Sequence, residues 1–109
     1  MNWLAYTYLI VALHLSPAQA ELAEFKVLEV TSYCDIGLTA SGVPAGPGLA
    51  GCDYRYPFGT TFYLPDGTRW RCADRGKIEG DAWLDVWLST CQEAIVWGRR
   101  KVAAWIIAP

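Results

Sequence analysis

Four cysteines in a short chain constrain the fold more than any other feature of this sequence. Cys34, Cys52, Cys72 and Cys91 are spaced at nearly equal intervals, and no two of them form a C-x-x-C pair. A small domain buries little core, so covalent cross-links add usefully to its stability. Four cysteines in a small exported protein are typical of two disulfides formed in an oxidising compartment, and the signal for export is described next. Zinc binding is the alternative, and the wide spacing disfavours it.

The first 20 of the 109 residues contain no Asp, Glu, Lys or Arg. An apolar run over residues 4–15 ends in S-P-A-Q-A, which has the small-residue pattern of a signal-peptide cleavage site. We therefore predict a signal peptide over residues 1–20 and a mature domain over residues 21–109. A retained membrane anchor is the alternative, although the run is short for a bilayer span. The prediction is a secreted protein, periplasmic or extracellular, that meets the membrane only during export.

The charged residues and the single histidine narrow the possible functions. Nine basic and eleven acidic residues give a net charge of −2, which provides no electrostatic reason to expect nucleic acid as a partner. His14 lies in the predicted signal peptide, so the mature chain cannot form a Ser-His-Asp or Cys-His site. Acid–base catalysis would then depend on carboxylates, Lys, Tyr or Cys. We expect no metal and no cofactor.

The first half of the mature chain has strand and loop patterns. Residues 25–33 are rich in β-branched and aromatic side chains and predict a strand. Residues 37–51 contain five glycines and two prolines, which predict a long loop. The segments 60–64 and 68–72 flank Pro-Asp-Gly and predict a hairpin.

The second half adds a helix between two strands. A short strand over residues 83–88 precedes a helix over residues 89–97, in which Thr90 and Glu93 have capping-box spacing. Gly98 suits the C-terminal cap, and an apolar strand ends at residue 107. Short strands, one helix and many turn signals favour an all-β class and a small β-barrel.

Three aspartates, Asp53, Asp74 and Asp85, lie beside strands or glycine-rich turns. Asp85 sits inside the apolar run W-L-D-V-W, where a carboxylate is costly unless it is paired or hydrogen-bonded. This context favours a functional role for Asp85. A turn-forming role is favoured for the aspartates without apolar context, which are Asp35, Asp66 and Asp81.

Eight short motifs follow one another through the mature chain. They are T-S-Y-C at 31–34, T-A-S-G at 39–42, A-G-C-D at 50–53, P-F-G-T at 57–60, A-D-R-G-K-I-E-G at 73–80, L-D-V-W at 84–87, E-A-I-V-W-G-R-R at 93–100 and V-A-A-W-I-I at 102–107. In this order they make the sequence similar to the three-aspartate (3D) domain. That domain is found in membrane-bound lytic transglycosylase A and in small muralytic proteins related to resuscitation-promoting factors.

The resemblance implies a six-stranded double-psi β-barrel with a groove across one face. It implies that Asp85 is the general acid/base, that Asp74 supports it, and that Asp53 has a structural or substrate-orienting role. It also places Thr39 close to the groove. Trp70 and Trp83 flank the acidic segment and are candidates for a groove wall that stacks on sugar rings, with core packing as the alternative.

The activity that the resemblance implies is that of a lytic transglycosylase, which cleaves peptidoglycan glycan strands to 1,6-anhydro-muramyl products. One carboxyl group can act as acid and then as base if its pKa is raised. Apolar neighbours, Leu84 and Val86, and a second carboxylate, Asp74, favour such a rise in the pKa of Asp85. Hydrolysis by two carboxylates is the chemical alternative.

The sequence departs from the family pattern in several respects. Arg75 stands between Asp74 and Gly76, and Trp87 replaces a Tyr or Phe. We also expect neither the second domain of the larger transglycosylases nor a separate wall-binding module. A wall-binding protein partner could therefore complete the groove. Two other functions stay open: a non-catalytic carbohydrate-binding or wall-loosening barrel, and a disulfide-bonded interaction domain of a larger envelope machine.

For the disulfides we expect Cys34–Cys52 and Cys72–Cys91. These pairs close loops of similar length around the long loop and the helix. The other two pairings remain open.

Overall fold

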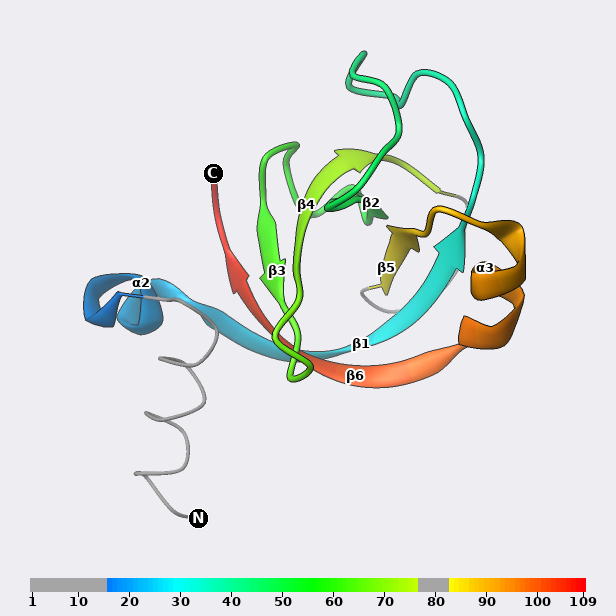
Figure 1. The fold of residues 1–109 in the computed structure, drawn as a ribbon. Helices are drawn as coiled ribbons and strands as arrows, with labels where there is room; N and C mark the ends of the chain where they lie inside the picture. Colours follow the sequence, from blue (N-terminus) through cyan, green and yellow to red (C-terminus); the bar gives the residue numbers. More distant parts are fainter. Residues whose placement is uncertain (1–15, 77–82) are drawn as a thin grey trace.

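The computed structural model describes residues 16–76 and 83–109, and within them six strands form a closed barrel (Figure 1). The strands are β1 (Glu24–Tyr33), β2 (Leu49–Cys52), β3 (Thr61–Tyr63), β4 (Arg69–Asp74), β5 (Trp83–Trp87) and β6 (Arg100–Ile107). Helix α2 (Pro17–Leu22) precedes the barrel, and helix α3 (Cys91–Trp97) lies between β5 and β6. Most of the predicted signal peptide, residues 1–15, lies outside the described residues, as does the segment 77–82. No helix in the described part of the chain is long and apolar enough to cross a membrane.

Around the barrel the strands follow the order β1-β5-β2-β4-β3-β6, and β6 returns to β1. The pairs β1–β5 and β2–β4 are parallel, and the other four pairs are antiparallel. The predicted fold class, a small six-stranded all-β barrel with one short helix between its strands and with disulfides, is confirmed. Closure gives each of these six strands a hydrogen-bonded neighbour on both sides.

Strand β2 lies where the sequence predicted the end of a loop. The loop was predicted to run to residue 51, whereas the strand begins at Leu49 and places Ala50, Gly51 and Cys52 in buried positions. Its sequence, L-A-G-C, has no β-branched or aromatic residue that would indicate a strand. It is extended because it pairs with β4 on one side and with β5 on the other.

The core consists of alternate strand residues that point into the barrel. Leu28 and Val30 of β1 and Leu84 and Val86 of β5 are fully buried. Because successive side chains of a strand point to opposite faces, Asp85 lies on the outer face between two core residues. The apolar context of this aspartate in the sequence is therefore the pattern of a strand whose other face is the core.

Helix α3 is short and forms as its caps predict. The Thr90 hydroxyl accepts a hydrogen bond from the backbone N–H of Glu93 at 3.1 Å, and Gly98 ends the helix with φ of +66°. None of its residues is buried. The helix is held to the barrel by the disulfide from Cys91 and by two hydrogen bonds. The Trp97 indole donates to the Val30 carbonyl at 3.2 Å, and the Ser32 hydroxyl donates to the Ala94 carbonyl at 3.0 Å.

The disulfides join Cys34 to Cys91 and Cys52 to Cys72, so the pairing that we expected is wrong. Cys52 and Cys72 belong to the neighbouring strands β2 and β4, and their Cα atoms are 5.6 Å apart. Cys34 follows β1 directly and lies 5.1 Å (Cα–Cα) from Cys91 at the start of α3. Strand order, rather than loop length, decides which cysteines meet. Two disulfides indicate an oxidising, non-cytoplasmic environment.

Candidate active site

Asp74 and Asp85 lie on two strands that flank Gly51 on the outer face of the barrel. In the register, Gly51 of β2 pairs with Asp74 of β4 on one side and with Asp85 of β5 on the other. Two strand spacings separate the two aspartates, which corresponds to about 10 Å between their Cα atoms. Gly51 has no side chain to fill the space between them, so a gap lined by carboxyl groups remains.

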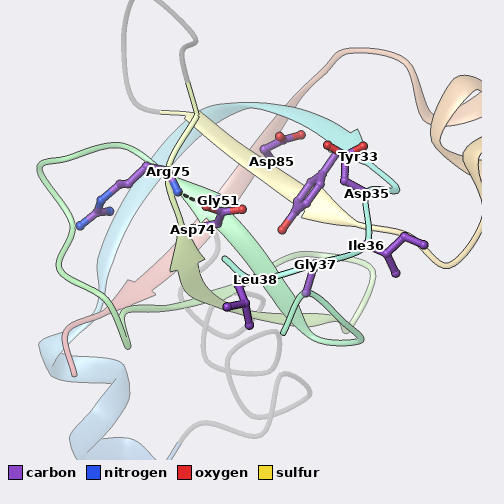
Figure 2. Close-up of a pocket in the computed structure, with 10 residues that line it drawn as sticks. Tyr33, Asp35, Ile36, Gly37, Leu38, Gly51, Asp74, Arg75 and Asp85 are labelled. Atoms are coloured by element: carbon purple, nitrogen blue, oxygen red, sulfur yellow. Dashed lines mark hydrogen bonds between the residues drawn. The ribbon is translucent and has the colours of Figure 1, made fainter. Parts of the chain in front are cut away.

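The gap is part of a pocket with a volume of about 270 Å³ (Figure 2). Its floor is Gly51 with the two aspartates, and one wall is the segment that follows β1. Two apolar side chains of that segment are strongly exposed at the pocket, Ile36 at 92% and Leu38 at 76%. The pocket therefore combines acidic groups with an apolar rim. The lining residues are Tyr33, Asp35, Ile36, Gly37, Leu38, Ala45, Gly51, Asp74, Arg75 and Asp85.

Asp85 is partly buried and is held by one side chain. The Thr31 hydroxyl on the adjacent parallel strand β1 donates to Oδ1 of Asp85 at 2.9 Å. Burial raises the pKa of Asp85, and the negative charges of Asp74 and Asp35 raise it further, while the Thr31 hydrogen bond lowers it. The net effect is a raised pKa, so Asp85 keeps its proton to a higher pH than an ordinary carboxyl group.

Asp74 is held by the backbone rather than by a side chain. Its Oδ1 accepts hydrogen bonds from the N–H of Ala40 at 2.9 Å and from the N–H of Arg75 at 2.8 Å. Figure 2 shows the second of these bonds at the edge of the pocket. Asp74 and Asp85 thus have different surroundings: two backbone donors hold Asp74, whereas burial and one hydroxyl act on Asp85.

Tyr33 brings a third polar group into the pocket. Figure 2 shows its hydroxyl end directed toward Asp74. The hydroxyl is buried and makes no hydrogen bond of good geometry within the described residues. Burial, followed by the charges of Asp74 and Asp85, raises the pKa of Tyr33 to about 12. The phenol therefore stays protonated at neutral pH, and its hydroxyl is a hydrogen-bond donor beside Asp74 in an acidic pocket.

The loop between β1 and β2 is hydrogen-bonded to the end of β4 through residues 40 and 41. Thr39 is buried, and its hydroxyl donates to the Val43 carbonyl at 2.8 Å. The N–H of Ser41 donates to the Ala73 carbonyl at 3.0 Å, next to the Ala40–Asp74 bond. Thr39 therefore shapes the loop beside the pocket and is not among the residues that line it.

Arg75 holds a second loop against the pocket. Its guanidinium donates to the carbonyls of Tyr56 at 2.8 Å and Asp53 at 3.2 Å. It also lies over the rings of Phe58, 4.2 Å from the centroid, and Tyr54, 5.1 Å away. The residue that departs from the family pattern thus fixes the loop that follows β2.

Asp53 is not brought to the other two aspartates. Its carboxylate accepts from the backbone N–H of Arg55 at 2.9 Å and forms an ion pair with the Arg55 side chain at 3.3 Å. Asp53 does not line the pocket, and its role in the structure is that of a turn former. The structure therefore joins two of the three aspartates in one site.

The two tryptophans that were expected to form a groove wall are buried. Trp70 is 8% exposed, packs in the core and donates its indole N–H to the Thr68 hydroxyl at 2.8 Å. Trp83 is 2% exposed. Neither is among the residues that line the pocket, although the Trp83 ring lies beside Gly51 and Gly76. Two exposed aromatic rings lie against Arg75 at the edge of the pocket, Tyr54 at 79% and Phe58 at 38%.

Sequence reasoning missed Thr31, Tyr33 and Gly51 as members of the site. Thr31 and Tyr33 are two residues apart on β1, so they lie on the same face of the strand, and Thr31 pairs with Asp85. Both are within the T-S-Y-C motif, but only the strand pairing shows what they face. Gly51 had been assigned to the loop.

Among the described residues, no group of three or more His, Cys, Asp or Glu side chains is placed to hold a metal ion. Comparisons of the chain with protein-family models, with curated proteins and with solved structures find no match.

Proposed function

We propose that this protein is an exported lytic transglycosylase that cleaves the glycan strands of peptidoglycan, with Asp85 as general acid and base. The observation that carries the proposal is the pairing of a carboxyl group of raised pKa with a second carboxylate across Gly51 in an open pocket. The single histidine of the chain, His14, lies in the predicted signal peptide, which leaves the same task to carboxyl groups. The similarity to the three-aspartate domain supplies the substrate class.

The proposed reaction needs one group that first gives and then takes a proton. The Asp85 carboxyl group protonates the glycosidic oxygen as the bond from the anomeric carbon to that oxygen breaks. The resulting carboxylate then removes the proton from the 6-hydroxyl of the same muramic acid residue. That oxygen bonds to the anomeric carbon and gives the 1,6-anhydro ring. No water is consumed, and Asp85 ends with the proton it needs for the next cycle.

Asp74 and Tyr33 support this reaction in different ways. The negative charge of Asp74 raises the pKa of Asp85 and would stabilise positive charge that develops at the anomeric carbon. The Tyr33 hydroxyl, with its pKa of about 12, acts only as a hydrogen-bond donor, toward a sugar oxygen or a carboxylate in the pocket. The exposed Ile36 and Leu38 side chains offer an apolar surface to a sugar ring.

The test is an analysis of the fragments that the oxidised protein releases from purified peptidoglycan. Wild type is compared with Asp85→Asn, which keeps the shape of the side chain, and with Glu93→Gln, a matched change of carboxyl to amide on the exposed helix α3. Mass spectrometry should find fragments lighter by one water molecule than the hydrolysis products, from wild type and Glu93→Gln alone. Hydrolysis products of full mass would contradict the proposed transglycosylase reaction. The absence of any product would contradict the proposal that the protein cleaves glycan strands.

A non-catalytic glycan-binding barrel is the second candidate. It is favoured by Tyr54, Ile36 and Leu38, which expose large apolar side chains around the pocket. It predicts that strands bind equally well to wild type and to Asp85→Asn and that neither releases product. The same two proteins therefore distinguish the candidates.

A further inference from the structure

A second pocket on the barrel surface is lined by two arginines. Arg69 and Arg71 are exposed and lie two positions apart on β4, so their side chains leave the same outer face of the strand. They line a pocket of about 460 Å³ with the turn Pro47–Gly48 and with Thr61 of β3. Within the described residues, neither guanidinium forms an ion pair or a hydrogen bond through its side chain.

Two unpaired guanidinium groups side by side are unusual on this molecule. The chain carries more acidic than basic residues, yet the ion pairs of the described part are Arg55–Asp53 and Arg99–Glu29. Like charges on one strand face repel each other, so this arrangement gains from a bound anion. A guanidinium presents planar paired donors that match the two oxygens of a carboxylate. The pocket has the chemistry of an oxyanion site.

The arginine pocket and the aspartate pocket lie along the same pair of strands. Leu49 of β2 pairs with Arg71, and Gly51 of β2 pairs with Asp74. The two pockets are therefore offset by two residues of β2, which corresponds to about 7 Å along the strand. A polymer that follows this ladder from the aspartates would next meet the arginines.

We propose that Arg69 and Arg71 bind a carboxylate of the peptide stem carried by the glycan strand whose bond is cleaved at Asp85. This inference rests on the proposed function, because it takes the glycan to occupy the aspartate pocket. In a strand with its stems, the lactyl carboxyl group of each substituted muramic acid is bound in an amide to the stem, so the free carboxylates lie on the stem. The arginine pocket thus selects strands that still carry their stems over strands that have lost them.

Binding measurements in the Asp85→Asn background test this without turnover. Three kinds of strand of equal length are compared: strands with stems, strands whose stems an amidase has removed and whose freed lactyl carboxyl groups are then capped as methylamides, and strands that keep stems but have lost attached phosphodiester polymers. The double variant Arg69→Gln/Arg71→Gln is compared with Lys26→Gln/Lys101→Gln, which removes the same charge from β1 and β6. Thermal unfolding and disulfide content confirm that each variant is folded.

The expected result is that removal of the stems weakens binding about tenfold, as the loss of a charge-assisted hydrogen bond would. The arginine variant should bind all three strands like the stem-free strand, and the lysine variant should bind like its parent. Loss of affinity with the phosphodiester polymers instead of the stems would overturn the proposal. So would equal affinity for strands with and without stems, which would leave the proposed function standing. Failure of the parent to bind any strand would overturn the proposed function and this inference together.

Discussion

The interior of the barrel and the outer face of β4, β2 and β5 come from the same strands but are built differently. Inside, Leu84 and Val86 are fully buried among other apolar side chains. Outside, Asp85 stands between them in sequence and faces a pocket with Asp74. Because alternate residues serve the two faces, stability and chemistry are carried by different side chains of one strand. Substitutions on the two faces should therefore have separable effects.

The largest effect is expected from Asp85→Asn. Loss of the acid/base should lower the rate of product release about 10³-fold, within the range found for general acid–base groups. Because the amide needs no proton and keeps the Thr31 partner, the free energy of unfolding should not fall. Rates on peptidoglycan and thermal unfolding measure the two quantities. If Asp85→Asn lowers the stability as well as the activity, the two faces do not contribute separately to stability and catalysis.

The opposite result is expected for Leu84→Ala on the inner face. Removal of this fully buried side chain leaves a cavity and should lower the free energy of unfolding by about 3 kcal/mol. The activity per folded molecule should stay near that of wild type. Urea unfolding measures the stability, and the activity is measured at urea concentrations well below the unfolding midpoint. Ile95→Ala is the control, because Ile95 is 81% exposed. A strong loss of activity in fully folded Leu84→Ala would contradict it.

Gly51→Val should fill the space between the two carboxyl groups. A Cβ atom at Gly51 would meet Asp85 Cβ at 3.6 Å and the Trp83 ring at 3.7 Å, which are ordinary contacts. The Cβ atom is therefore accepted, and the two methyl groups of valine should extend into the gap, displace substrate and lower the rate about 10²-fold. Thermal unfolding checks that the variant is folded. Gly46→Val, at a position with open space and without a positive φ, is the matched control. Equal rates for both variants would show that the gap is not used.

Tyr33→Phe removes a neutral hydrogen-bond donor and should lower the rate about tenfold. The decline of activity at alkaline pH should stay where it is, because it reports the loss of the Asp85 proton rather than that of Tyr33, whose pKa is about 12. A pH–rate profile of the variant measures both effects. A displaced alkaline limb would mean that Tyr33 itself titrates in the reaction.

The smallest effect is on the pH dependence of stability. Because the pKa of Asp85 is raised in the folded state, the native protein holds this proton where the unfolded chain has lost it. Its contribution to the free energy of unfolding is full below the unfolded pKa and is lost as pH rises through the folded pKa. Asp85→Asn should therefore gain stability relative to wild type as pH rises from about 4. The free energy of unfolding of both proteins is measured as a function of pH, and a constant difference between them would contradict this prediction.

Local signals in the sequence predicted the elements that depend on neighbours in the chain. The hairpin around Pro65–Gly67 and the caps of α3 at Thr90 and Gly98 are confirmed, because each is formed by residues a few positions apart. Strand β2 was missed, because L-A-G-C is extended only through its two partner strands. The disulfide pairing was wrong for the same reason, since Cys52 meets Cys72 only once β2 has joined β4.

The site could be predicted in part. Asp74 and Asp85 were predicted to belong to one site, and the structure places them on either side of Gly51. The carboxylate of Asp53 instead forms an ion pair with Arg55. The raised pKa of Asp85 was predicted with Leu84 and Val86 as a cause, although these side chains point into the core. Its burial comes instead from groups on the outer face, which only the folded arrangement brings to it.

The disulfide between Cys34 and Cys91 has a consequence for how fast the barrel forms. Closure of the barrel requires β1 to pair with β5 and β6, which follow it by more than fifty residues, and contacts between such distant segments slow folding. The bridge joins the residue after β1 to the start of α3, across a sequence separation of 57. In the oxidised chain the bridge already holds these distant segments together, so refolding should be faster than in the reduced chain. The bridge on the barrel rim thereby acts on kinetics as well as on stability.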